Sequence, residues 1–183
     1  PIAGLLMTCI VAIVGLYLPP VDTFGTPAST IGMHVSLGYP PLLQFLSWLT
    51  RQPLHYPSGK MVNPVVIGAW VGLFITFLNL LPVGQLDGGH ILRAMIGERQ
   101  ESVSSAIPLA LFLLAGFVYY SYDGAWNAVF LWSLWGGLSM FFAMNGSTTP
   151  VYESSLDRRR FFLGILTFVV GALCFTPVPI YIG

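Results

Sequence analysis

Long apolar runs separated by polar connections dominate this chain. A helix needs roughly 20 residues to cross about 30 Å of hydrocarbon. The pattern predicts five such helices, at residues 2–18, 64–83, 106–122, 125–144 and 161–175. Asn63 followed by Pro64 predicts where the second helix begins, because Asn is a good N-cap and Pro fits the first helical position.

The longest polar stretch is the connector at residues 21–62, which is rich in Pro, Gly, Ser and Thr. Its one apolar patch, "PPLLQFLSWLTRQPL", is too short to span a membrane. The patch predicts a short amphipathic helix that is re-entrant or interfacial, with Trp48 and Arg51 at headgroup depth. We therefore predict an all-α integral membrane fold: a polytopic bundle of about five transmembrane helices with this connector, forming a single membrane domain at residues 1–183.

Composition supports a membrane protein. Hydrophobic residues make up 55% of the 183 residues and charged residues only 8%, whereas soluble domains carry about 25% charged residues. Seven basic and seven acidic residues give a net charge of zero and form no long basic tract, which argues against a nucleic-acid partner. Cys9 and Cys174 lie in apolar runs without metal or redox spacing and are interpreted as packing residues. We place the protein in the cell membrane as a multi-pass protein.

The second predicted helix ends on an unusual sequence, "NLLPVGQLDGGH" at residues 79–90. An ionisable residue at membrane depth costs about 2.5 to 3.5 kcal/mol and usually marks function, so Asp87 is a candidate site residue. Pro82 interrupts a helix, and the two glycines after Asp87 allow a close approach of backbone. We predict a bent element that lines a polar pocket.

Several roles remain open from the residues alone. Asp87 could relay protons, bind a cation or complete a metal site, or it could simply cap the following helix. Asn79 could make a hydrogen bond between membrane helices. His90 could share a helical face with Asp87, although a hydrogen-bonding or structural role is the simpler interpretation.

The same residues carry a family resemblance. "NLLPVGQLDGGH" resembles the Asn-x-x-Pro-x-x-x-Leu-Asp-Gly motif of the site-2 protease family of intramembrane zinc metalloproteases. "PIAG" at the start resembles the end of that family's Gly-Pro-hydrophobic-Ala-Gly motif, and "GAWVGLFITFLNLLPVGQLDGGHILRAMIG" resembles its archaeal branch. The resemblance covers residues 1–97.

The resemblance implies a role for each motif residue. Asp87 would be the third ligand of one zinc ion, and Asn79 would hold the substrate or stabilise the oxyanion. Pro82 and Gly88 would shape the turn. The family's His-Glu-x-x-His helix, which carries two zinc ligands and the general base, is absent from this sequence and normally precedes the "PIAG" motif. The resemblance therefore implies the carboxy-terminal part of a larger peptidase domain.

The expected function is that of a zinc metalloprotease that cleaves transmembrane segments of membrane proteins, as in regulated intramembrane proteolysis. Its expected partners are a membrane-protein substrate with a transmembrane helix and the lipid bilayer. The alternative is a non-catalytic membrane-embedded relative that acts as a binding or chaperone-like module. An ion transporter would require further charges inside the membrane, and the five predicted helices supply none.

Overall fold

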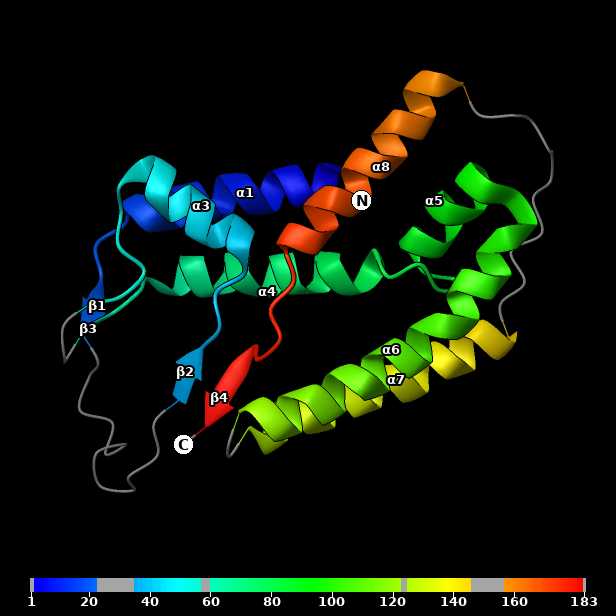
Figure 1. The fold of residues 1–183 in the computed structure, drawn as a ribbon. Helices are drawn as coiled ribbons and strands as arrows, with labels where there is room; N and C mark the ends of the chain where they lie inside the picture. Colours follow the sequence, from blue (N-terminus) through cyan, green and yellow to red (C-terminus); the bar gives the residue numbers. More distant parts are fainter. Residues whose placement is uncertain (1, 23–34, 57–59, 123–124, 146–156, 183) are drawn as a thin grey trace. The chain divides into compact units, whose positions relative to one another are not determined.

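The computed structural model describes residues 2–22, 35–56, 60–122, 125–145 and 157–182 (Figure 1). The chain divides into two compact units. Unit 1 comprises Pro1–Phe77 and Leu173–Gly183, and unit 2 comprises Leu78–Ala172. The prediction of a single membrane domain at residues 1–183 stays a prediction.

Unit 1 is built from apolar helices and four short strands. Its helices are α1 (Ile2–Tyr17), α3 (Pro41–Thr50) and α4 (Pro64–Asn79, of which the part through Phe77 belongs here). The strands form two antiparallel pairs: β1 (Val21–Asp22) with β3 (Lys60–Met61), and β2 (Val35–Leu37) with β4 (Ile180–Ile182). The strands are a departure from the all-α prediction, because the β2–β4 pair joins the connector to a distant carboxy-terminal segment.

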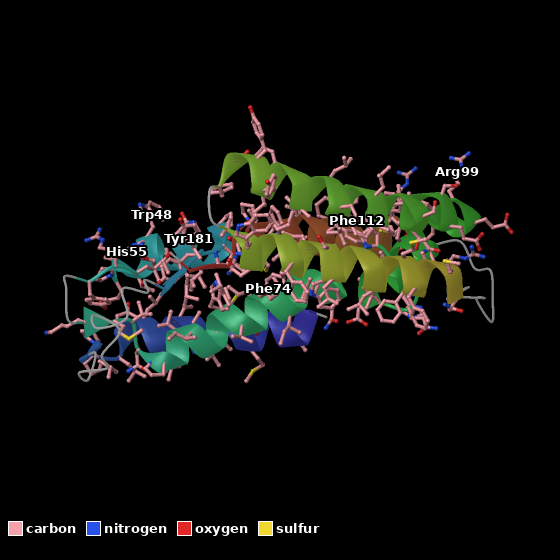
Figure 2. All side chains as sticks on the ribbon, turned by 90° about the horizontal axis from the view of Figure 1, so that it is seen from below. Trp48, His55, Phe74, Arg99, Phe112 and Tyr181 are labelled. Atoms are coloured by element: carbon pink, nitrogen blue, oxygen red, sulfur yellow. The ribbon has the colours of Figure 1, made fainter. Side chains whose placement is uncertain are left out.

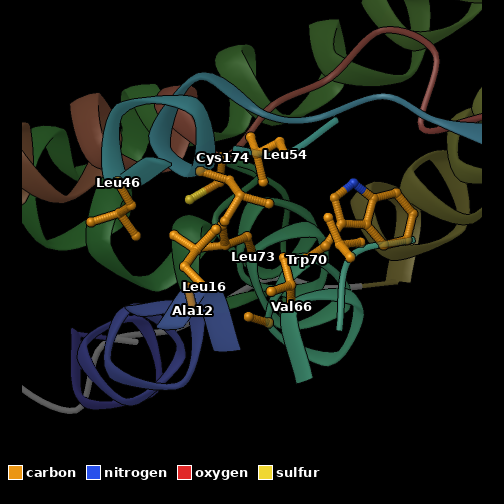
Figure 3. Packing of buried hydrophobic residues seen from close by; sticks show 11 residues of the cluster. Ala12, Leu16, Leu46, Leu54, Val66, Trp70, Leu73 and Cys174 are labelled. Atoms are coloured by element: carbon orange, nitrogen blue, oxygen red, sulfur yellow. The ribbon is translucent and has the colours of Figure 1, made fainter. Parts of the chain in front are cut away.

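The core of unit 1 lies where α1, α3 and α4 meet. Figure 3 shows apolar side chains from these helices converging with Cys174, which is fully buried. The core residues include Ala12, Leu16, Leu43, Leu46, Val66, Trp70 and Leu73. The indole Nε1 of Trp70 donates to the carbonyl of Gly38 at 2.7 Å, which satisfies the polar atom of this buried ring. Helix α3 confirms the short helix that was predicted in the connector, and it packs on α1.

Unit 2 consists of helices. They are α5 (Asp87–Ile96), the 3-10 turn η1 (Gly97–Arg99), α6 (Gln100–Ser121), α7 (Trp126–Asn145) and α8 (Arg158–Leu173, of which the part through Ala172 belongs here). Arg99 is exposed at the turn before α6 and extends away from the helix (Figure 2).

Helices α6 and α7 lie side by side as an antiparallel hairpin (Figure 1). Their buried residues repeat every three to four positions: Gln100, Ser104, Pro108, Leu111, Ala115 and Val118 on α6, and Ala128, Trp132, Gly136 and Ser139 on α7. Large apolar side chains cover the other faces, among them Phe117 at 57% exposed and Phe130 at 70% exposed. Helices that are apolar on all sides fit a lipid environment.

A helix is found at each of the five predicted positions, but five membrane spans are not confirmed. Among the described residues, two helical stretches are long and apolar enough to cross a membrane, Asp87–Ser121 and Trp126–Asn145. Helices α1, α4 and α8 have 16 residues each, or about 24 Å at 1.5 Å per residue. That length is less than the hydrocarbon thickness.

The bounds of α4, α6 and α8 differ from the predicted ones, and α8 is Arg158–Leu173 rather than 161–175. Helix α4 ends at Asn79 rather than at residue 83, because the chain enters tight turns before Pro82. Helix α6 begins at Gln100 rather than at residue 106. The prediction followed the apolar run alone, whereas the polar residues before Ala106 are also part of the helix. The predicted beginning of α4 is confirmed, since the side chain of Asn63 accepts the N–H of Val65 at 3.1 Å.

Candidate metalloprotease site

The loop between α4 and α5 is a compact series of turns. The N–H of Leu81 donates to Leu78 O at 3.2 Å, that of Val83 to Leu81 O at 2.8 Å, and that of Leu86 to Val83 O at 2.9 Å. Gly84 has a φ of +33°, in the region that glycine tolerates best. The predicted bent element is confirmed, whereas its polar pocket stays a prediction.

Two glycines allow the first turn of α5 to pack directly on this loop. A Cβ at Gly88 would clash with the carbonyl group of Leu80 and lie 2.5 Å from the carbonyl oxygen of Leu81. A Cβ at Gly89 would clash with the carbonyl oxygen of Gly84. Both glycines are buried. Backbone therefore contacts backbone on this side of α5, and that contact fixes the beginning of the helix.

Asp87 is the first residue of α5, and its side chain is exposed. The N-cap of the helix is Leu86, which makes no side-chain capping bond, so the capping role considered for Asp87 is wrong. No hydrogen bond or ion pair joins the Asp87 carboxylate to another described residue. The amino-terminal end of a helix favours a negative charge. The structure thus presents an unpaired carboxylate at the end of a fixed loop.

Asn79 and His90 lie on either side of the same loop. Asn79 is the last residue of α4 and is exposed. In the part of the chain that the structure describes, its amide makes no hydrogen bond between helices. His90 is exposed in the first turn of α5, where its backbone N–H donates to Leu86 O at 3.2 Å. Asn79 and Asp87 therefore delimit one short loop, and both are open to a ligand.

Residues on other helices of unit 2 support this loop, and no sequence motif indicated them. The hydroxyl of Ser104 on α6 accepts the N–H of Gly84 at 3.1 Å, and this contact is buried. On α8, Gly171 leaves space that Leu80 fills, because a Cβ there would lie 2.8 Å from a Leu80 methyl carbon. No sequence motif identifies the small residues at these positions, because their role comes from packing between segments that are distant in sequence.

Charged and polar groups also gather where α5 turns into α6. The guanidinium of Arg93 lies 3.6 Å from the carboxylate of the exposed Glu101, and the Arg93 side chain is only 14% exposed. The Gln100 side chain is 2% exposed, and its amide nitrogen has no hydrogen-bond partner among the described residues. An exposed partner makes the ion pair weak, on the order of 0 to 1 kcal/mol.

A separate pocket of about 410 Å³ lies in unit 1 beside α3. It is lined by Leu37, Tyr39, Gln44, Ser47, Leu54 and His55. The Tyr39 hydroxyl donates to Leu54 O at 3.3 Å, and partial burial raises the pKa of this phenol. The ring of His55 meets that of Tyr39 edge-on at 5.5 Å. The connector therefore holds a concave surface with aromatic and polar walls.

The described residues do not form a zinc site by themselves. No group of three His, Cys, Asp or Glu side chains within them is arranged to hold a metal ion. A catalytic zinc ion usually takes three protein ligands, and the loop supplies one carboxylate. Asp87 fits the part of a single ligand, because it is exposed, unpaired and held on a fixed turn.

The helices and the loop define a class of protein: a helical protein with apolar membrane-type helices and an unpaired carboxylate between two of them. Comparison with known proteins gives the family. The chain belongs to peptidase family M50, the site-2 protease family, whose sequence profile matches residues 1–121. The predicted family is thereby confirmed, and the match extends past the motif into α6.

The chain is similar to several plant proteins. It is 28% identical to the probable zinc metalloprotease EGY2, chloroplastic, of Arabidopsis thaliana, over 98% of this chain and 30% of that protein. It is 26% identical to EGY2 of Oryza sativa subsp. indica, over 98% of this chain and 31% of that protein. It is 33% identical to the probable zinc metallopeptidase EGY3, chloroplastic, of Arabidopsis thaliana, over 64% of this chain and 18% of that protein.

The chain thus spans about a third of the length of the EGY2 proteins. No solved structure matches the chain at a significant level. The EGY2 relatives are named as probable zinc metalloproteases and EGY3 as a probable zinc metallopeptidase, which supports a metalloprotease in general terms. Because they are chloroplast proteins, the predicted archaeal likeness and the predicted cell-membrane location stay predictions.

Proposed function

We propose that this chain is part of a membrane zinc metalloendopeptidase that cleaves transmembrane segments of membrane proteins, as in regulated intramembrane proteolysis. Membership of family M50 and the names of the relatives support a metalloprotease. The observation that carries the proposal is the Asp87 carboxylate, which is exposed, unpaired and fixed at the start of α5.

In this proposal, Asp87 contributes one carboxylate ligand to a site whose other ligands and general base come from a part of the protein outside this chain. Asn79 lies at the other end of the loop, where its amide can donate to a substrate carbonyl or to the negative charge that develops on it. Zinc, when bound, supplies Lewis acidity toward the peptide carbonyl.

The proposed substrate is a membrane protein with a transmembrane helix, and the proposed location is a membrane that the protein crosses several times. The two helices of sufficient length and the exposed apolar faces of α6 and α7 support a membrane location. The pocket beside α3 supports a role of the connector in receiving an unwound part of the substrate, because it offers apolar and polar walls together.

The test compares zinc content and cleavage of a membrane-spanning test substrate by the full-length protein and its variants. Loss of a residue that only supports a metal ligand typically lowers metal affinity or activity by about 10- to 100-fold. Asp87 is proposed as a ligand itself, so we expect Asp87→Ala and Asp87→Asn to lower both zinc binding and cleavage by more than that. Glu98→Gln is the matched control, since Glu98 is an exposed carboxylate in the neighbouring η1 turn. It should behave as the wild type.

Removing zinc with a chelator should abolish cleavage, and adding zinc back should restore it. Retained zinc together with unchanged cleavage in Asp87→Ala would remove Asp87 from the site. A wild-type protein that binds the test substrate but neither holds zinc nor cleaves it would favour the non-catalytic binding module instead.

A further inference from the structure

Among the described residues, one side-chain hydrogen bond joins α6 to the loop that precedes Asp87. The backbone N–H of Gly84 donates to the hydroxyl oxygen of Ser104 at 3.1 Å. Both residues are buried, and Ser104 is only 4% exposed. The two residues are 20 positions apart, so the packing of two separate segments creates this bond.

The hydroxyl of Ser104 makes a different kind of hydrogen bond from the hydroxyls of Thr76 and Thr167. Those of Thr76 and Thr167 donate to the carbonyl four residues earlier in their own helix, at 2.8 Å, which is the common local arrangement. Ser104 instead accepts from the loop. The neighbouring Ser105 is exposed, and its hydroxyl donates within the helix to Ser102 O at 2.9 Å. A general helical role therefore does not account for the Ser104 contact.

Gly84 transmits this contact to the beginning of α5. Its carbonyl oxygen lies so close to Gly89 that a Cβ there would clash. Gly84 is thus held at its N–H by Ser104 and at its carbonyl by the first turn of α5. Asp87 lies between Gly84 and Gly89 in the chain. A change in the position of Gly84 must therefore move the backbone that carries the Asp87 carboxylate.

We propose that Ser104 is a positioning residue of this site: its hydroxyl holds Gly84 and so sets the place and direction of the Asp87 carboxylate. This inference rests on the proposed function, because it concerns the same site. Ser104 contacts neither the substrate nor the metal in this scheme. Its effect passes through the loop, so it should change the catalytic step more than the binding of substrate.

The test uses the full-length protein with Ser104→Ala, Ser104→Thr and the matched control Ser105→Ala. Hydrogen exchange of the peptide that contains Gly84 measures the hydrogen bond directly. Loss of one buried hydrogen bond should raise this exchange about 5- to 10-fold in Ser104→Ala. We expect kcat to fall by a similar factor while KM stays within about twofold. Ser104→Thr should restore both, and Ser105→Ala should match the wild type.

Unchanged exchange in Ser104→Ala, or a kcat equal to that of Ser105→Ala, overturns the inference. A folded Ser104→Thr variant that keeps the defect overturns it as well, because the hydroxyl would then not be the cause. Should Ser104→Ala fail to fold, Ser104→Cys offers a weaker acceptor, and wild-type exchange in that variant overturns the inference.

Asp87→Ala, measured in parallel, separates this inference from the proposed function. Full cleavage by Asp87→Ala contradicts the proposed function itself. An inactive Asp87→Ala beside a fully active Ser104→Ala contradicts only the role of Ser104.

Discussion

Replacing Gly88 with alanine tests the close packing that fixes Asp87. The added Cβ would clash with the carbonyl group of Leu80 and lie 2.5 Å from the carbonyl oxygen of Leu81. These are backbone atoms, which cannot rotate away as the end of a flexible side chain can. Either the loop or the first turn of α5 must therefore shift, and Asp87 must shift with it.

Two opposing effects set the magnitude. Alanine stabilises a helix relative to glycine by roughly 0.5 to 1 kcal/mol. Overpacking in a close contact costs about 1 to 3 kcal/mol, and rigid backbone neighbours favour the upper part of that range. We expect Gly88→Ala to lower the free energy of unfolding by a net ~1 to 2 kcal/mol. For a chain of this length, that corresponds to a fall in Tm of roughly 2 to 8 °C.

The assay is thermal unfolding of the purified protein in detergent, with two glycine-to-alanine variants as matched controls. A Cβ at Gly116 on α6 or at Gly137 on α7 meets no atom within 4 Å. Gly116→Ala and Gly137→Ala should therefore keep or slightly raise the Tm. A Gly88→Ala protein as stable as these controls would refute the close packing and with it our account of how Asp87 is placed.

Further substitutions test the other contacts. Asn79→Ala should lower kcat/KM for a membrane-spanning substrate by about 10²- to 10³-fold if its amide donates to the oxyanion, and a change below about twofold would contradict a role in the site. Asn63→Ala removes the cap on Val65 and should cost about 0.5 to 2 kcal/mol in a denaturation curve. Asn63→Ser should cost less, because it keeps a capping oxygen and loses only the exposed bond from the Asn63 amide to Pro19 O at 3.1 Å. Trp70→Phe leaves the carbonyl of Gly38 without its 2.7 Å donor and should cost at least about 1 kcal/mol; unchanged stability would show that this bond contributes nothing.

Most helices of this chain could be predicted from the sequence, because long apolar runs leave few alternatives to a helix. Not all of their bounds could. Helix α4 ends at Asn79 rather than at residue 83, since loops and turns take up apolar residues as readily as a helix does. The strands β2 and β4 could not be predicted either, because each has three residues and their pairing depends on segments that are far apart in sequence.

The candidate site, like the fold, could be predicted from the sequence only in part. The motif around Asp87 predicted the family and the bend, because Pro82 and the glycines restrict the backbone locally. It left open whether Asp87 caps a helix. The structure answers that question, since Leu86 takes the N-cap position and the carboxylate stays exposed.

The sequence by itself determined the apolar helices, the family motif and the identity of the candidate residues Asn79 and Asp87, because these depend on local composition and spacing. Only the tertiary structure decided what holds them in place. Ser104 contacts Gly84 from 20 residues away, and the carbonyl groups of Leu80 and Leu81 pack against Gly88. Contacts of this kind arise when separate segments pack together, so no local pattern of hydrophobic and polar residues records them.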